Sequence, residues 1–274
     1  MIDAGLRGRV ALVTGGNQGI GAAAVRALAE QSAAVFITYL RLGKDDPGVQ
    51  ATKLDAYASA RAQTADALVD EIRSAGGRAA AFEADLADPS VVPVIFDYAE
   101  AALGPVEILF NNADTWVADT FLPDAKDDFG RNLTPVTAIT HDHSFSVNSR
   151  ATALLIAEFA RRHIARGADW GRIISMTSGG EGGFAREVSY GASKNALESY
   201  TQAAAWELGK YGITANILYP PPTDTGWITP EMAAQFASEG PLYHVVQPED
   251  VADVVVFLAS HQARFVTGQK IRMW

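Results

Sequence analysis

The chain has 274 residues, of which 48% are hydrophobic, with a formal net charge of −10 and no cysteine. This length and hydrophobic content suit one large domain with a sizeable core and exclude a disordered chain. The acidic charge disfavours nucleic acid and anionic membranes as partners, and the lack of cysteine excludes disulfides, thiolate metal sites and cysteine nucleophiles. With no signal pattern and no apolar run of membrane-spanning length, we expect a protein of the reducing cytoplasm.

The first predicted elements are a short strand, a glycine-rich turn and a helix. Val10–Val13 is followed by Thr14-Gly15-Gly16-Asn17-Gln18-Gly19-Ile20-Gly21 and then by an alanine-rich stretch, 22–31. A continuous apolar strand indicates burial on both faces, as in a parallel sheet. Glycines let the backbone approach a pyrophosphate, and the helix N-terminus offers it free N–H groups. Glycine can also simply close a turn, but strand, turn and helix in this order predict a dinucleotide-binding unit.

The residues after the second predicted strand, 34–39, bear on which dinucleotide is bound. An acid here would hydrogen-bond the 2′-hydroxyl of the adenosine ribose and repel a 2′-phosphate. The chain instead has Arg41, with no acid before Asp45, and an arginine can pair with a 2′-phosphate. A solvated loop arginine accounts for Arg41 equally, so the sequence favours NADP(H) and does not exclude NAD(H).

Strands and helices continue to alternate along the chain. We expect strands at 79–84, 106–110, 172–176, 212–218 and 265–271, and helices at 60–75, 91–103, 140–166, 229–239 and 248–260, with another helix that carries Tyr190 and Lys194 and ends near 208. Polar, turn-rich 43–57 and aperiodic 115–137 are interpreted as insertions, the second beside the substrate. The alternation predicts an α/β, doubly wound Rossmann-like fold with a single parallel sheet of about seven strands flanked by helices. We expect one domain, 1–274, with a small substrate-loop region at about 225–247.

Tyr190 and Lys194 stand one helical turn apart, so on a helix they share a face. Such pairs also occur by chance, with the tyrosine half buried and the lysine solvated. Reduction of a ketone needs a hydride donor on one side and a proton donor at the oxygen, and tyrosine can give that proton. An unperturbed tyrosine titrates at about 10, so a neighbouring cation that lowers its pKa makes it a better acid at neutral pH. We expect Lys194 to supply that cation.

Taken together, these motifs resemble the short-chain dehydrogenase/reductase family of the classical type over nearly the whole chain, 6–271. Residues 14–21 match the family's TGxxxGIG loop, Asn111-Asn112-Ala113 its NNAG motif, and Asp85-Leu86 its adenine-binding pair. Among its members, the 3-oxoacyl-acyl-carrier-protein reductases are the most similar kind. The resemblance implies an NADP(H)-dependent oxidoreductase that reduces a ketone, or oxidises a secondary alcohol, with Tyr190 as general acid/base.

The resemblance also implies the site residues. The catalytic tetrad falls on Asn148, Ser178, Tyr190 and Lys194: Ser178 orients the carbonyl oxygen, Lys194 also holds the nicotinamide ribose, and Asn148 holds a water that relays protons from the lysine. Thr177 is an alternative hydroxyl, and the alternative for Asn148 is a solvent-facing helix residue. The implied cofactor-binding residues are Gly15, Asn17, Gln18, Gly19, Ile20, Gly21, Arg41, Asp85, Leu86, Asn112, Ala113, Tyr190, Lys194, Thr223 and Thr225.

Several residues depart from the family pattern. Asp114 replaces the glycine of NNAG, Pro221 replaces a glycine after the sixth strand, and the C-terminus lacks a closing Gly-Gly pair. Gln18 occupies a position that is often basic in NADP-dependent members. Asp114 and Pro221 keep open a non-catalytic NAD(P)-binding sensor or assembly subunit on the same fold, and a dehydratase or isomerase on this scaffold is a third alternative.

The remaining expectations concern partners. The insertions indicate a specialised small-molecule carbonyl or alcohol substrate, such as a polyketide or aromatic ketone. Aromatic side chains either line its pocket or pack in the core: Trp116, Phe121, Trp227 and Tyr243. We expect no metal site, because His141 and His143 have no identifiable third ligand. Family members associate through helices like the one that carries Tyr190, so we expect a homo-oligomer, a dimer or a tetramer.

Overall fold

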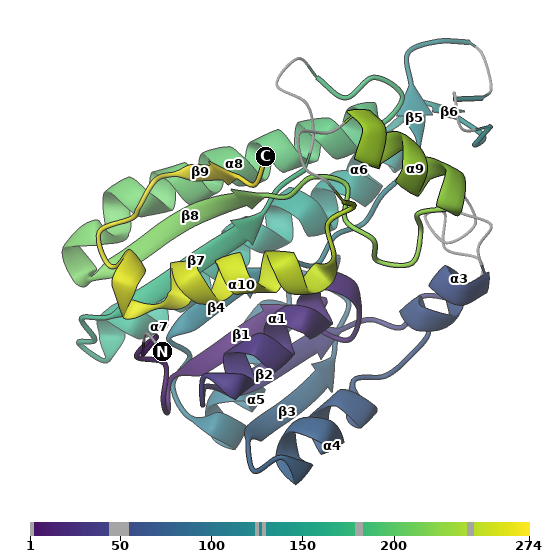
Figure 1. Cartoon of the computed structure of the whole chain (residues 1–274). Helices are drawn as coiled ribbons and strands as arrows, with labels where there is room; N and C mark the ends of the chain where they lie inside the picture. The colour runs from purple at the N-terminus through teal and green to yellow at the C-terminus, as the bar shows by residue number, and fades with distance from the viewer. Residues whose placement is uncertain (1–2, 44–54, 124–125, 128–129, 179–182, 240–243) are drawn as a thin grey trace.

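A seven-stranded sheet runs through the molecule in the order β3-β2-β1-β4-β7-β8-β9, and each neighbouring pair is parallel (Figure 1). The computed structural model describes residues 3–43, 55–123, 126–127, 130–178, 183–239 and 244–274. The strands are β1 (Val10–Thr14), β2 (Ala34–Tyr39), β3 (Arg78–Glu83), β4 (Ile108–Asn111), β7 (Gly171–Met176), β8 (Ile213–Tyr219) and β9 (Lys270–Arg272). The predicted doubly wound α/β fold with one parallel sheet is confirmed.

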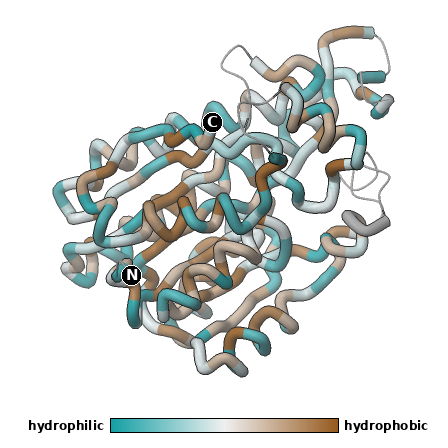
Figure 2. Tube along the Cα trace, in the orientation of Figure 1, coloured by the Kyte–Doolittle hydropathy of each residue, from teal (hydrophilic) through white to brown (hydrophobic). Residues whose placement is uncertain are grey.

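Helices cover both faces of the sheet. One face carries α1 (Gly19–Glu30), α4 (Asp66–Ser74) and α10 (Pro248–Ala259), and the other carries α5 (Val91–Leu103), α7 (Thr152–Ala165) and α8 (Val188–Leu208). In β1, Val13 packs into the first core and Leu12 into the second, which explains why this strand is apolar at consecutive positions. The hydrophobic colour in Figure 2 follows the strands through the interior. Among the described residues, no helix is long and apolar enough to cross a membrane.

The strand order determines where a site can form. β1 has β2 on one side and β4 on the other, so the chain proceeds in opposite directions from β1. The loops that leave the carboxyl ends of these strands therefore diverge and leave a crevice at this edge of the sheet. Because the strands are parallel, the segments after β1, β2, β4, β7 and β8 all emerge at that edge.

Two predicted helices are interrupted. The helix expected at 60–75 consists of α3 (Asp55–Arg61) and α4, since the Thr64 hydroxyl accepts a hydrogen bond from Asp66 N at 3.3 Å and starts a second helix. The helix expected at 140–166 consists of α6 (Ala138–Phe145), a π-helical turn (Ser146–Ala151) and α7. At this turn the Thr152 hydroxyl donates to the backbone carbonyl of Asn148 at 3.0 Å, a contact that competes with the regular helical hydrogen bonds.

The last strand and the two insertions also differ from expectation. The last strand begins later than predicted: β9 covers 270–272 and shares only 270 and 271 with the predicted 265–271, because the Thr267 hydroxyl accepts from Ala215 N and Gly268 has a φ of +70°. Most of the insertion at 43–57 lies outside the described residues. The insertion at 115–137 contains β5 (Asp119–Thr120) and β6 (Thr134–Pro135), which pair in parallel beside the start of α8 (Figure 1). The helix α9 (Pro230–Glu239) lies in the predicted substrate-loop region.

Candidate active site

A cavity of about 920 Å³ opens at the carboxyl edge of the sheet. Its wall is built from the glycine turn, the segments that follow β2, β3, β4, β7 and β8, and the first turns of α8. Apart from Arg41, every predicted cofactor-binding residue lies in this wall, as do Ser178, Tyr190 and Lys194. Asn148 is not in the wall, because it is buried behind it.

The glycine turn is fixed to the end of β4 by side-chain hydrogen bonds. Thr14 Oγ1 accepts from Asn112 N and Ala113 N, both at 3.0 Å, and Asn112 Nδ2 donates to Thr14 O at 2.9 Å and Gly15 O at 3.0 Å. A Cβ added at Gly21 would lie 2.1 Å from Gly15 O, so only glycine fits where the helix starts. Asn112 thus shapes the turn in addition to lining the cavity.

The wall beside this turn suits a dinucleotide. Gly15 and Gly19 have φ values of +63° and +51°, which leave the backbone open toward the cavity at the N-terminus of α1. Gln18 Oε1 and Thr38 Oγ1 are buried in the wall without a hydrogen-bond partner among the described residues. Unpartnered buried polar atoms are costly unless a ligand or water completes them, so the residues present fit a ligand with several hydroxyls and phosphates.

Two arginines lie near the end of β2, and they are placed differently relative to the cavity. Arg41 forms an ion pair with Glu83 on the neighbouring strand, at 2.9 Å, and is not in the cavity wall. Tyr39 and Glu83 are register partners, which explains why the side chain two residues later reaches this carboxylate. Arg61, at the end of α3, lines the cavity together with Leu40 and Leu42. Arg61 follows the predicted insertion at 43–57, where no recognisable motif marks it as a cavity residue.

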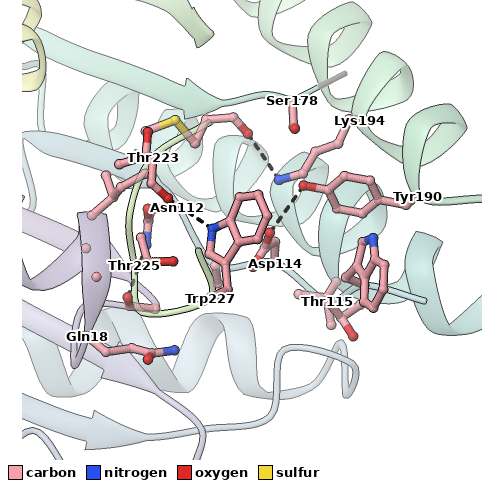
Figure 3. A pocket seen from close by; sticks show the side chains of 18 of the residues that line it. Gln18, Asn112, Asp114, Thr115, Ser178, Tyr190, Lys194, Thr223, Thr225 and Trp227 are labelled. Carbon is pink, nitrogen blue, oxygen red and sulfur yellow. Dashed lines mark hydrogen bonds between the residues drawn. The ribbon is translucent and has the colours of Figure 1, made fainter. Parts of the chain in front are cut away.

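Tyr190 and Lys194 share the inner face of α8 at the other end of the cavity (Figure 3). Tyr190 is 7% exposed and Lys194 is 2% exposed. Lys194 Nζ donates to Met176 O at 3.2 Å and lies 5.6 Å from the centre of the Tyr190 ring. Burial lowers the pKa of Lys194, and the charge of Asp114 opposes that change. The solvated, chance pair that the sequence left open is excluded by this burial.

The environment changes the acidity of Tyr190 in the direction opposite to our expectation. The hydroxyl of Tyr190 donates to Asp114 Oδ2 at 3.4 Å. Burial, and next the Asp114 carboxylate, raise the pKa of Tyr190 well above its usual value, while a hydrogen bond with Ser178 acts in the lowering direction. Burial and the carboxylate thus outweigh the acidifying effect that we expected of Lys194.

Ser178 is the better placed of the two hydroxyls after β7. The Thr177 hydroxyl donates to Glu198 Oε1 at 2.7 Å, and Glu198 in turn pairs with Lys270. Ser178 lines the cavity and forms a hydrogen bond with Tyr190. Figure 3 shows its side chain near those of Lys194 and Tyr190. Ser178 and Tyr190 therefore present two hydroxyls at the same end of the cavity.

Asn148 is fully buried in the π-helical turn, so the solvent-facing alternative is wrong. Its Oδ1 accepts from Thr115 N, and its Nδ2 donates to Thr115 O and to Ser193 Oγ, each at 2.9 Å. These contacts bind the start of the 115–137 insertion to α8. The side chain acts on protein partners here, and the predicted water relay stays a prediction.

A second contact between the insertion and α8 was not predicted. Asp119 is 0% exposed, and its carboxylate accepts from Ser189 N at 2.8 Å and from the Ser189 hydroxyl. A carboxylate that accepts backbone N–H groups at a helix N-terminus stabilises that helix. Because Asp119 lies seventy residues earlier in a segment with no periodicity, no local pattern identifies this cap.

The substrate end of the cavity is aromatic and acidic. Of the four predicted aromatics, Trp116 and Trp227 line it, Phe121 is 80% exposed, and Tyr243 lies outside the described residues. In Figure 3 the Trp227 indole lies between the 223–225 loop and Tyr190, and its Nε1 donates to Thr223 O at 3.0 Å. Burial raises the pKa of Glu187, whose carboxylate binds Arg131 at 2.9 Å.

His141 and His143 have different protein partners. His143 Nε2 lies 2.5 Å from the Thr115 hydroxyl, while His141 stacks on Phe145 with ring centres 4.2 Å apart. Within the described ranges, no three His, Cys, Asp or Glu side chains are grouped so that they could hold a metal ion.

Comparisons with known proteins agree on one kind of relative. The family model described as enoyl-(acyl carrier protein) reductase matches residues 49–273. A short-chain type dehydrogenase/reductase of Picea abies is 34% identical, covering 98% of this chain and 92% of that protein, and a probable tetrahydroxynaphthalene reductase of Zymoseptoria tritici is 32% identical, covering 97% and 93%. The crystal structure of a blue fluorescent protein from a metagenomic library, in complex with NADPH, superposes with a TM-score of 0.77 at 34% identity over 98% of this chain and 97% of that one.

Proposed function

The chain belongs to the short-chain dehydrogenase/reductase family and is an oxidoreductase, and we propose that it reduces a ketone with NADPH as the hydride donor. One observation carries the proposal. The hydroxyls of Tyr190 and Ser178 meet beside buried Lys194 at one end of a cavity whose other end is a glycine turn suited to a dinucleotide.

In the proposed reaction, different side chains orient the carbonyl group, donate the proton and stabilise the developing charge. NADPH, when bound, supplies a hydride to the carbonyl carbon. Ser178 donates a hydrogen bond that orients the carbonyl oxygen, and Tyr190 gives its phenolic proton to that oxygen as negative charge develops there. Lys194, held by Met176 O, keeps a positive charge near the phenol and limits the cost of the phenolate that is left behind. Asn148 fixes the wall next to Tyr190 through Thr115.

Tyr190→Phe tests this assignment. Removal of the proton donor reduces kcat by about 10²–10⁴-fold, with little effect on NADPH binding. The loss is measured as NADPH oxidation over a panel of cyclic and aromatic ketones. Tyr200→Phe is the matched control, since Tyr200 is on the same helix, is 47% exposed and is not in the cavity wall. Unchanged turnover of the Tyr190→Phe protein refutes the mechanism.

The preference for NADPH is assigned to Arg61. Arg61 lines the cavity beside Leu40 and Leu42, which follow β2, whereas Arg41 lies outside the cavity wall. A guanidinium that binds the 2′-phosphate is worth about 1.5–3 kcal/mol, so Arg61→Ala weakens NADPH binding by about 10–100-fold and leaves NADH binding unchanged. Arg41→Ala is the control and changes both affinities by less than about threefold. Equal losses for NADPH and NADH, measured by fluorescence titration, contradict this assignment.

The proposed substrate is an aromatic or polyketide-like ketone. Trp116, Trp227 and Phe184 line the substrate end, and flat apolar side chains favour a flat, apolar substrate. The named activity of the Zymoseptoria tritici relative is consistent with this class. A single domain with a substrate-loop region at 225–247, a homo-oligomeric assembly and a cytoplasmic location remain predictions from the sequence.

A further inference from the structure

Asp114 is a carboxylate that faces the reacting hydroxyl and that the proposed mechanism does not use. It is the third residue after β4, and its Oδ2 lies 3.4 Å from the hydroxyl of Tyr190 (Figure 3). The backbone on both sides of Asp114 is fixed. Ala113 N donates to Thr14 Oγ1 at 3.0 Å, and Thr115 N donates to Asn148 Oδ1 at 2.9 Å. The carboxylate is therefore held at the phenol by the fold.

The charged groups around Tyr190 come from several segments. Asp114 approaches from the loop after β4, Lys194 lies one turn on along α8, and Glu187 precedes that helix. Glu187 is bound by Arg131, so the arginine of the insertion faces that carboxylate. From α6, His143 contacts the Thr115 hydroxyl. Asp114 is thus the anion that hydrogen-bonds directly to the phenol.

We propose that Asp114 is a positioning residue that keeps Tyr190 protonated, and so extends to alkaline pH the range in which Tyr190 can act as the proton donor. The inference rests on the proposed function. In the step, a hydride from NADPH joins the carbonyl carbon while the phenolic O–H breaks and its proton joins the carbonyl oxygen. The phenolate that remains lies beside a carboxylate and recovers a proton from solvent before the next turnover.

The direction of the effect follows from charge. A phenolate next to a carboxylate is less stable than one next to a neutral amide, and both burial and Asp114 raise the pKa of Tyr190. Reduction needs the phenol, so its rate falls when pH exceeds the pKa of Tyr190. Oxidation of the alcohol needs the phenolate, so it requires higher pH. Removal of the carboxylate moves both limits to lower pH, and the equilibrium constant of the reaction is unchanged.

The test compares Asp114→Asn with the unchanged protein. The amide keeps the size of the side chain and removes its charge, and Asp114→Gly is a second variant that restores the residue of the family motif. The first measurement is the ultraviolet absorbance of tyrosinate against pH, from which the titration of the Tyr190→Phe protein is subtracted. The second is the pH profile of kcat/KM for ketone reduction. Asp142→Asn is the control, because it removes the same charge from an exposed site whose side chain is 79% accessible.

We expect the phenolate titration and the alkaline limit of reduction to move down by at least about one pH unit, a tenfold change in acidity, in both Asp114 variants. No shift in the control is expected. If reduction occurs but neither curve moves, the inference about Asp114 is overturned. If no ketone is reduced while the absorbance titration still moves, the proposed reaction is wrong and the effect of Asp114 on Tyr190 stands, because that titration needs neither substrate nor turnover.

Discussion

Replacement of Asp119 tests whether the 115–137 insertion holds the catalytic helix in place. Its carboxylate is fully buried and accepts two hydrogen bonds from Ser189, the residue before Tyr190. Two hydrogen bonds to a charged acceptor contribute about 3–6 kcal/mol in total, and loss of a buried carboxylate recovers part of its desolvation cost. Asp119→Ala therefore lowers the free energy of unfolding by about 2–4 kcal/mol.

Thermal unfolding followed by circular dichroism, together with ketone reduction, measures the effect. For a chain of this size the loss corresponds to about 5–12 °C in Tm. We also expect kcat to fall by at least about tenfold, because the first turn of α8 carries Tyr190, the proposed proton donor. Asp119→Asn keeps one acceptor for Ser189 N and is expected to retain about half of the lost stability. Asp253→Ala removes an exposed carboxylate from α10 and is the control for net charge. A stable and fully active Asp119→Ala protein refutes the idea that the insertion holds α8.

Three further predictions concern other parts of the molecule. Gly21→Ala places a Cβ 2.1 Å from Gly15 O, so NADPH affinity falls by more than about 100-fold, and an affinity within threefold of the original contradicts the role of the turn. Two arginines of α7 lower the pKa of Glu158 from 4.5 to about 2, so its contribution to stability is present above pH 4.5 and is lost as pH falls toward 2. Glu158→Gln thus lowers the free energy of unfolding by about 1–2 kcal/mol at pH 7. It also makes that free energy fall less steeply between pH 4.5 and 2, which urea titrations at several pH values measure. Trp206 on α8 is 89% exposed, so Trp206→Lys is expected to dissociate a homo-oligomer, and a monomeric unchanged protein in sedimentation velocity excludes this interface.

The sequence predicted the sheet well because its elements carry their own periodicity. The strand 10–13 is apolar at consecutive positions because both of its faces are buried. The glycine-rich turn after it predicts the helix that follows. A side chain that hydrogen-bonds to the backbone can interrupt a helix without changing the spacing of its apolar residues. The π-helical turn around Asn148 and the break before Asp66 were therefore missed.

Within the site, the sequence predicted which residues of the local motifs lie in the cavity. It did not predict contacts between side chains from segments that are far apart in the sequence. Tyr190, Lys194 and the glycine turn converge on one cavity as the motifs indicated. Arg41 was predicted from its place in the sequence; in the structure it pairs with Glu83 outside the cavity wall, and its role toward a cofactor stays a prediction. Asp114 was visible as a departure from the motif, yet only the structure gives its partner. Its proposed effect on the acidity of Tyr190 depends on the distance between Asp114 Oδ2 and the Tyr190 hydroxyl, and the number of residues between them in the sequence does not predict that distance.

The short run from Asp114 to Asp119 connects the end of β4 to Tyr190 and to the start of α8. Asp114 binds the Tyr190 hydroxyl, Thr115 is bound by Asn148, and Asp119 accepts from Ser189. Six consecutive residues thus reach the catalytic helix at its first turn, at its inner face and through the π-helical turn. The turn after β4 therefore brings a carboxylate to the Tyr190 hydroxyl, and the insertion that follows it is tied to α8 through Asn148 and at Ser189.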